Sequence, residues 1–183
     1  MNDAPELQNQ QLNRLRAAVL GANDGIVSTS SIMMGVIGAG ADQKAIFTAG
    51  LAAIVAGALS MAVGEYVSVS SQSDAEKVHI QKVHGGDTNA HEITSPWQAA
   101  VASLVSFTIG GLVPFVSVLL SPRALAVPIA FTAVFCALIF TGYTSATVGG
   151  ASRKRAVIRV VVGGILAMAI TYFVGRAFGA AVS

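Results

Sequence analysis

The chain has 183 residues, of which 54% are hydrophobic and 11% are charged, and its mean hydropathy is +0.68. A soluble domain has about 25% charged residues, so this composition indicates that a lipid bilayer is the main solvent. It excludes a nucleic-acid-binding protein, which needs a dense basic face. The net charge is +2, but all nine acidic residues lie within residues 1–92. Carboxylate chemistry is therefore expected in the first half of the chain, and the single cysteine, Cys136, excludes an intrachain disulfide.

The apolar segments predict an all-α integral membrane protein with five transmembrane helices. A membrane-spanning helix needs about 20 mostly apolar residues, and lipid offers no partner for unpaired backbone groups. Residues 1–16 are polar and are expected to form a cytosolic N-terminal tail, followed by a five-helix transmembrane domain at residues 17–183. The helices are predicted at about 17–40, 45–70, 98–120, 126–149 and 157–180, with a short cytosolic loop at 71–97.

The first predicted helix carries an acidic residue, Asp24, on a face of small and polar residues. An ionised carboxylate inside a helix bundle costs several kcal/mol unless it is paired or hydrated. Asp24 lies eight residues after Arg16, so the helical rise places it roughly 12 Å from the cytosolic edge. Asp24 is therefore a candidate metal ligand and proton carrier. The structural alternative is a hydrogen bond to a neighbouring helix end.

The second predicted helix carries Met61 and Glu65 on a stripe that also holds Gly57 and Gly64. Measured back from its cytosolic end, Met61 lies roughly 13 Å deep and Glu65 roughly 7 Å deep. Asp24 and Met61 thus have similar depths on antiparallel neighbours, which predicts a shared metal site with Glu65 nearer the cytosol. The alternatives are that Met61 fills the core and that Glu65 extends its carboxylate to the interface.

Four weaker metal candidates follow from residue type alone. Met33 and Met34 lie further along the first helix and could extend the path, although methionine more commonly fills a core. His91 and Glu92 precede the predicted membrane entry of the third helix and could collect metal, with an ordinary solvated loop as the alternative. The last three predicted helices contain no acidic residue, so they are expected to form a scaffold.

The distribution of lysine and arginine predicts the orientation, because cytosolic loops carry the excess of these residues. Eight of the eleven lie in the N-terminus, the 71–97 loop, and the turn before the fifth helix together with the first residues of that helix, up to Arg159. The N-terminus is therefore expected in the cytosol and the C-terminus on the far side. The absence of a targeting segment favours a bacterial plasma membrane, with an organelle (vacuole-like) membrane as the alternative.

Two glycine-lined helix faces that each carry a carboxylate predict a close helix interface around a polar path. Five helices are few to enclose such a path, so we expect it between two copies of the chain in a homodimer. Carboxylate oxygen together with thioether sulfur suits a borderline or soft divalent transition metal better than Mg²⁺ or Ca²⁺. Fe²⁺ is the first candidate, followed by Mn²⁺, Co²⁺ and Zn²⁺, and no resident cofactor is expected.

Two sequence blocks carry a resemblance to a known family: RAAVLGANDGIVS at residues 16–28 and GALSMAVGEYVSVSSQ at residues 57–72. They resemble the vacuolar iron transporter family. The resemblance implies a five-helix protomer, a homodimer with the ion path at its interface, and Fe²⁺/H⁺ antiport out of the cytosol. It places the buried aspartate and methionine of the family at Asp24 and Met61, and its cytosolic glutamate at Glu65. The 71–97 loop is too short for the large cytosolic metal-binding domain of longer members, so the chain looks similar to the short, nodulin-like branch.

The sequence therefore predicts a proton-coupled divalent-metal transporter in which Asp24 and Glu65 exchange metal for protons. One alternative is a membrane scaffold or assembly protein without transport, which accounts for the glycine faces but not for the carboxylates within them. A membrane enzyme is the other, and no catalytic motif of the zinc-peptidase, serine-hydrolase or phosphate-loop type is present in the sequence. The expected partners are the lipid bilayer, divalent metal ions, protons and a second copy of the chain.

Overall fold

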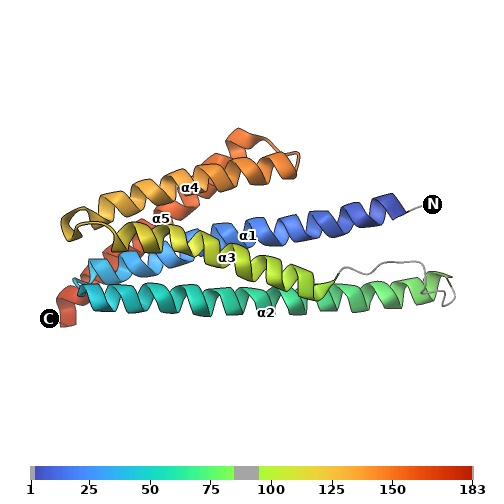
Figure 1. Cartoon of the computed structure of the whole chain (residues 1–183), viewed down its shortest axis with the longest axis horizontal. Helices are drawn as coiled ribbons and strands as arrows, with labels where there is room; N and C mark the ends of the chain where they lie inside the picture. Colours follow the sequence, from blue (N-terminus) through green and yellow to red (C-terminus); the bar gives the residue numbers. More distant parts are fainter. Residues whose placement is uncertain (1–2, 85–94, 183) are drawn as a thin grey trace.

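The computed structural model describes residues 3–84 and 95–182, and these form an extended helical bundle (Figure 1). Within these ranges there is no β-strand. The long helices are α1 (Asp3–Gly38), α2 (Gln43–His84), α3 (Pro96–Leu119), α4 (Ala126–Val148) and α5 (Arg153–Val182), and a short 3-10 helix, η2 (Arg123–Leu125), precedes α4. The all-α fold expected from the sequence is thereby confirmed.

Three helices are longer than predicted: α5 begins a few residues early, at Arg153, and α1 and α2 extend further. α1 begins at Asp3, within the segment expected to be a tail, and α2 continues to His84, through half of the expected 71–97 loop. Residues 65–84 contain neither glycine nor proline, so nothing in the sequence interrupts the helix where its hydrophobicity falls. An ion pair between Lys77 Nζ and Asp74 Oδ1, at 3.6 Å and three residues apart, supports this extension.

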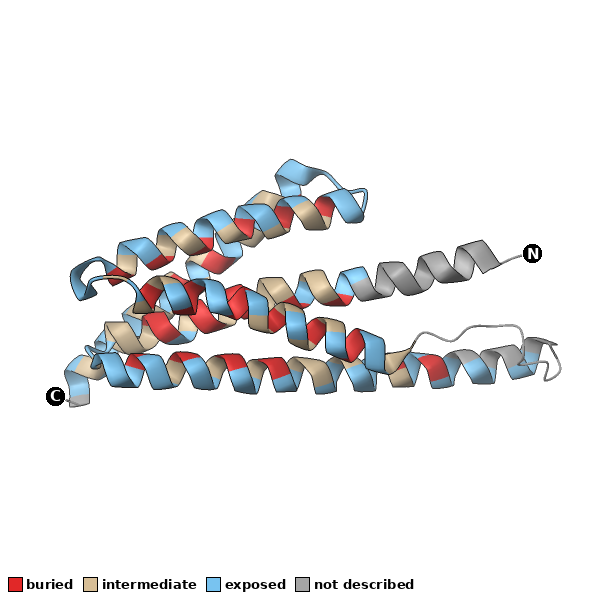
Figure 2. Ribbon diagram, viewed as in Figure 1, coloured by how far each residue is buried: buried red, intermediate tan, exposed pale blue. Residues whose placement is uncertain are grey.

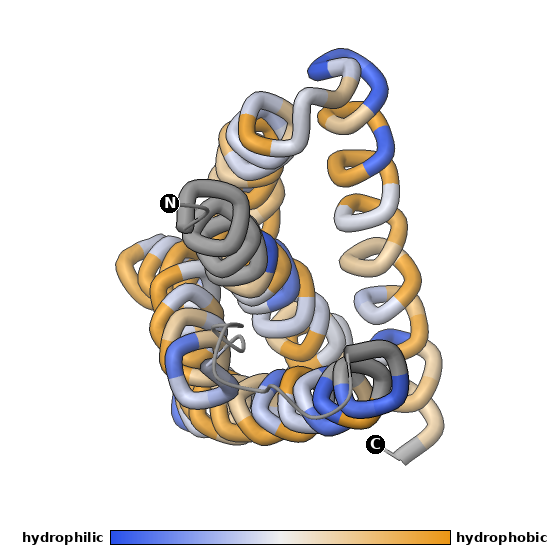
Figure 3. The backbone as a smooth tube through the Cα atoms, turned by 90° about the vertical axis from the view of Figure 1, so that its right-hand side faces the viewer, coloured by the Kyte–Doolittle hydropathy of each residue, from blue (hydrophilic) through white to orange (hydrophobic). Residues whose placement is uncertain are grey.

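In the part of the chain that the structure describes, four helices are long and apolar enough to cross a membrane: Gln43–Ala75, Pro96–Leu119, Arg123–Val148 and Arg153–Ala181. These correspond to four of the five predicted spans. α1 falls outside this set because its middle is polar, with Asn23 and Asp24 followed by a run of serine and threonine at residues 28–31. α1 nevertheless contacts every other long helix, and in the end-on view it runs through the middle of the bundle (Figure 3). Neighbouring helices therefore shield much of its polar surface.

The tightest crossing in this central arrangement lies between α1 and α3. A Cβ added to Gly21 would lie 2.7 Å from the carbonyl oxygen of Ser103, and Gly25 and Gly110 likewise face backbone atoms of the opposite helix. Any larger side chain would separate the two backbones, so glycine is required at these positions. Buried residues gather along α1 and α3, whereas α2 is largely exposed along its length (Figure 2).

The helices begin and end at two opposite ends of the bundle. The start of α1, the end of α2, the start of α3 and the α4–α5 turn lie at one end, and the α1–α2 turn and the end of α5 lie at the other (Figure 1). At the second end, Asp42 caps α2 by accepting a hydrogen bond from the backbone N–H of Ala45 at 2.7 Å. The Arg123 guanidinium donates to the carbonyl oxygen of Ala41 at 2.8 Å and ties two turns together.

Candidate metal-binding groove

A groove of about 340 Å³ lies between α1 and α2 and brings together the three strongest candidates from the sequence. Asp24 lines it from α1, and Met61 and Glu65 line it from α2. The other lining residues are small or apolar: Ser28, Ile32, Ala53, Ala56, Gly57, Ser60, Gly64 and the ring-bearing Phe107 of α3. The groove therefore presents two carboxylates and a thioether in an otherwise weakly polar setting.

Helical spacing explains why these side chains share one surface. Asp24 and Ser28 are four residues apart on α1, and Met61 and Glu65 are four residues apart on α2, so each pair occupies one helix face. α1 and α2 are in contact, and they run in opposite directions because the α1–α2 turn contains only a few residues. Asp24 therefore faces the part of α2 that carries Met61, as the common depth along the two helices predicts.

The Asp24 carboxylate is half-buried and held by its own helix. The hydroxyl of Ser28 donates a hydrogen bond to Asp24 Oδ1. A carboxylate has two oxygens with about four acceptor positions, so this single bond fixes the orientation of the group and leaves acceptor capacity for a ligand in the groove. Asp24 thus presents carboxylate oxygens at the groove, and Ser28 helps to orient them.

The Glu65 carboxylate is more enclosed and less well satisfied. Its side chain is 11% exposed, and among the described residues its buried Oε1 atom has no hydrogen-bond partner. The guanidinium of Arg16 approaches Oε1 to 3.6 Å, which makes an ion pair but is longer than the usual 2.7–2.9 Å of a charge-assisted hydrogen bond. The Oε1 atom of Glu65 therefore still has the capacity to accept a hydrogen bond.

Met61 and Gly64 complete the groove on α2. Met61 is half-buried and supplies the only sulfur among the lining residues. Gly64 has no atom within 4 Å of the place where a Cβ would stand, whereas Gly50 and Gly57 face the rings of Phe115 and Phe107. Two of the three regularly spaced glycines on α2 thus serve packing within one chain, and Gly64 leaves the groove open.

The weaker candidates have different places. Met33 and Met34 are fully buried, with 0% exposure, and belong to the hydrophobic core rather than to the groove. They face inwards because α1 is surrounded by the other helices, so even its methionines reach core positions. His91 and Glu92 lie outside the described residues. Among the side chains that the structure describes, no three from histidine, cysteine and the acidic residues form a cluster suited to a metal ion.

Arg16 is the residue at this site that the sequence interpretation missed, because Arg16 was used there only to mark the edge of the membrane. Its role could have been predicted from the depths of residues along the two helices. Glu65 lies roughly 7 Å from the cytosolic end and Arg16 lies at that edge, which a long arginine side chain can bridge. The direction of that side chain could not be read from the sequence.

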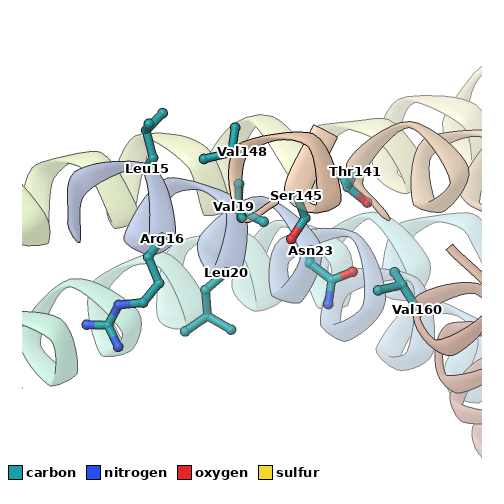
Figure 4. Close-up of a pocket in the computed structure, with 10 residues that line it drawn as sticks. Leu15, Arg16, Val19, Leu20, Asn23, Thr141, Ser145, Val148 and Val160 are labelled. Atoms are coloured by element: carbon teal, nitrogen blue, oxygen red, sulfur yellow. The ribbon is translucent and has the colours of Figure 1, made fainter. Parts of the chain in front are cut away.

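A second, larger cavity of about 550 Å³ lies between α1, α4 and α5 (Figure 4). Its walls are mainly apolar, with Val19 and Leu20 from α1 and Val148 from α4. The buried Oδ1 atom of Asn23 has no hydrogen-bond partner in the described part of the chain. No carboxylate, histidine or sulfur lines this cavity, so it lacks the ligands that a divalent cation needs.

Comparisons with known proteins find relatives over most of the chain. The family model described as the VIT family matches residues 15–84 and 77–176. Vacuolar iron transporter homolog 4 of Arabidopsis thaliana is 43% identical over 159 residues, which cover 86% of this chain and 80% of the relative. Vacuolar iron transporter homolog 2 of Oryza sativa subsp. japonica is 45% identical over 170 residues and 90% of both chains.

These matches confirm the family resemblance expected from residues 16–28 and 57–72. They give no support to the expected bacterial plasma membrane, because the relatives are plant proteins whose names refer to the vacuole. The family match covers most of the groove-forming helices, and the alignment with the rice relative covers nine-tenths of the chain. The chain belongs to the VIT family.

Proposed function

We propose that this protein carries a divalent transition metal, with Fe²⁺ as the preferred candidate and Mn²⁺ as the second, out of the cytosol in exchange for protons. The observation that carries this proposal is the single groove in which Asp24, Met61 and Glu65 meet between two long helices. The names of the relatives, vacuolar iron transporter homologs, point in the same direction. They also favour a vacuole-like membrane over a bacterial plasma membrane.

The donor atoms support a transition metal over the hard divalent cations. Mg²⁺ and Ca²⁺ bind through oxygen alone, whereas a thioether adds a soft ligand that Fe²⁺ accepts more readily. Met61 stands beside the carboxylates, although a leucine would fill the same space without offering sulfur. A metal path needs the sulfur of methionine at this position, whereas a scaffold protein does not.

The proposal includes a second copy of the chain. One protomer supplies two carboxylates and one thioether, which is short of the four to six ligands of a typical transition-metal site. A two-fold axis along the groove would double each donor. The outer face of α2 is apolar and exposed at Leu59, Val63 and Val67, and the open position at Gly64 leaves room for a neighbouring helix.

Proton coupling follows from competition for the same oxygen atoms. A metal ion binds the deprotonated form of Asp24 and Glu65, so a proton that arrives from an acidic compartment displaces the metal, and metal from the cytosol releases the proton. In this arrangement α1 is the fifth span, the N-terminus is cytosolic and the C-terminus lies on the far side. Eight of the eleven lysine and arginine residues then lie on the cytosolic side.

The test uses purified protein in proteoliposomes with an acidic lumen and Fe²⁺ or Mn²⁺ outside. Wild-type protein should take up metal and release lumenal protons, and Asp24→Asn should abolish both. Asp42→Asn is the matched control, because Asp42 is an exposed carboxylate at the far end of α2 and asparagine also caps helices well. Unchanged uptake by Asp24→Asn would reject the site, and an absence of metal-dependent proton flux in the wild type would favour a scaffold.

A further inference from the structure

We propose that Arg16 is a tethered counter-cation of Glu65, which an incoming metal ion displaces and which returns when the metal leaves. This inference rests on the proposed function of the groove. The inference assigns a positioning role to Arg16: the Arg16 guanidinium pairs with the Glu65 carboxylate until a metal ion binds there. The side chain thereby sets how strongly the cytosolic mouth of the groove attracts a cation.

The burial of Glu65 favours such a partner. With 11% of its side chain exposed and Oε1 lacking a hydrogen bond, the carboxylate has lost most of its water. An enclosed charge of this kind is costly unless an opposite charge is close. Among the described residues, Arg16 is the basic residue paired with it, at 3.6 Å.

The geometry of Arg16 fits a partner that can leave. Its side chain is 55% exposed, and the separation from Glu65 is too long for the two parallel hydrogen bonds of a locked arginine–carboxylate pair. Arg16 is also among the residues that line the larger cavity, and in Figure 4 its side chain extends from α1 in the direction opposite to Leu15. Arg16 can therefore move into water without leaving a buried charge of its own.

Charge then decides which cations enter. A divalent ion interacts with the carboxylate about twice as strongly as a monovalent group at the same distance, so it can replace the guanidinium. A monovalent ion carries no more charge than Arg16 does. Its binding would displace Arg16 from Glu65 without any gain in electrostatic attraction. The pair thus favours divalent over monovalent cations at the entrance.

The experiment measures equilibrium binding of Mn²⁺ to protein in lipid nanodiscs by calorimetry at fixed pH and salt. Exposed ion pairs contribute little, so Arg16→Gln should bind Mn²⁺ about two- to fivefold more tightly than the wild type. Arg16→Lys keeps the charge and should restore wild-type affinity. In a Glu65→Gln background, Arg16→Gln should have no effect on affinity.

Arg155→Gln is the matched control, because it removes one exposed positive charge from α5, a helix that makes no contact with α2 among the described residues. Its affinity should equal that of the wild type. If Arg16→Gln weakens binding or leaves it unchanged, Arg16 only braces α1 against α2 and the inference is wrong. If wild-type protein binds no Mn²⁺, the proposed function fails first, so the two failures can be told apart.

Discussion

Replacing Gly25 by alanine tests the contact between α1 and α3 that fixes one wall of the groove. Gly25 follows Asp24 in the chain, and it faces the backbone of Phe107, whose ring lines the groove. A Cβ at this position would lie 2.9 Å from the backbone nitrogen of Gly111, which is 0.5 Å inside the 3.4 Å of ordinary van der Waals contact, and closer still to the carbonyl oxygen of Phe107. Because the obstructing atoms belong to a backbone, α1 and α3 have to separate.

The expected cost follows from two opposing effects. Overpacking of this kind typically costs about 1–3 kcal/mol, and the upper part of the range applies because no side chain can turn aside. Alanine recovers about 1 kcal/mol through its better helix propensity. We therefore expect a net loss of about 2 kcal/mol for Gly25→Ala. Gly163→Ala is the matched control: nothing stands within 4 Å of that position, so only the helix-propensity gain remains.

The assay is thermal unfolding of both variants in the same detergent, followed by the far-ultraviolet circular dichroism of the helices. The two variants should differ by about 3 kcal/mol, which corresponds to roughly 6–12 °C in Tm for a chain of this length. Gly25→Ala should melt below the wild type and Gly163→Ala at or above it. Equal shifts of the two variants would refute the close α1–α3 crossing as a determinant of stability.

Three further predictions concern the groove and its supports. Met61→Leu keeps the volume and removes the sulfur, so uptake of Fe²⁺ relative to Mn²⁺ should fall in a competition assay, and an unchanged ratio would reduce Met61 to a packing residue. Gly64→Leu should convert the proposed homodimer to monomers in size-exclusion chromatography and should stop metal uptake. Gly163→Leu on α5 is the control and should do neither. If Gly64→Leu remains an active dimer, the second copy of the chain binds at another surface. Asp42→Ala should lower the free energy of unfolding by about 1 kcal/mol through loss of the bond to Ala45, and retained stability would show that α2 needs no cap.

Much of this fold can be predicted from the sequence because lipid restricts the choices so severely. The long apolar runs give the helices, and turn residues such as Gly40 and Gly150, both with positive φ, end them close to the expected places. The errors lie where helices leave the expected membrane region. Hydropathy falls after residue 70, but the helix of α2 continues to His84, since a polar segment without glycine or proline remains a good helix in water.

The candidate site could likewise be predicted only in part from the sequence. The shared depth of Asp24 and Met61 can be calculated from the helical rise, and both side chains line one groove. The directions of individual side chains cannot be calculated this way. Met33 and Met34 lie in the core because α1 has neighbours on several sides, and Arg16 reaches Glu65 because its flexible side chain turns toward α2. These outcomes depend on the packing of all five helices together.

The length of α2 has a mechanical consequence. With 42 residues it is about 63 Å long, whereas the whole bilayer with its headgroups is about 40–45 Å thick. A rod of this length stands well clear of the lipid, and between Glu65 and His84 it has no glycine or proline at which it could bend. In the proposed transporter, a tilt of the protruding segment is therefore transmitted along the helix toward Glu65, so movement at the far end of α2 is coupled to the proposed cation entrance.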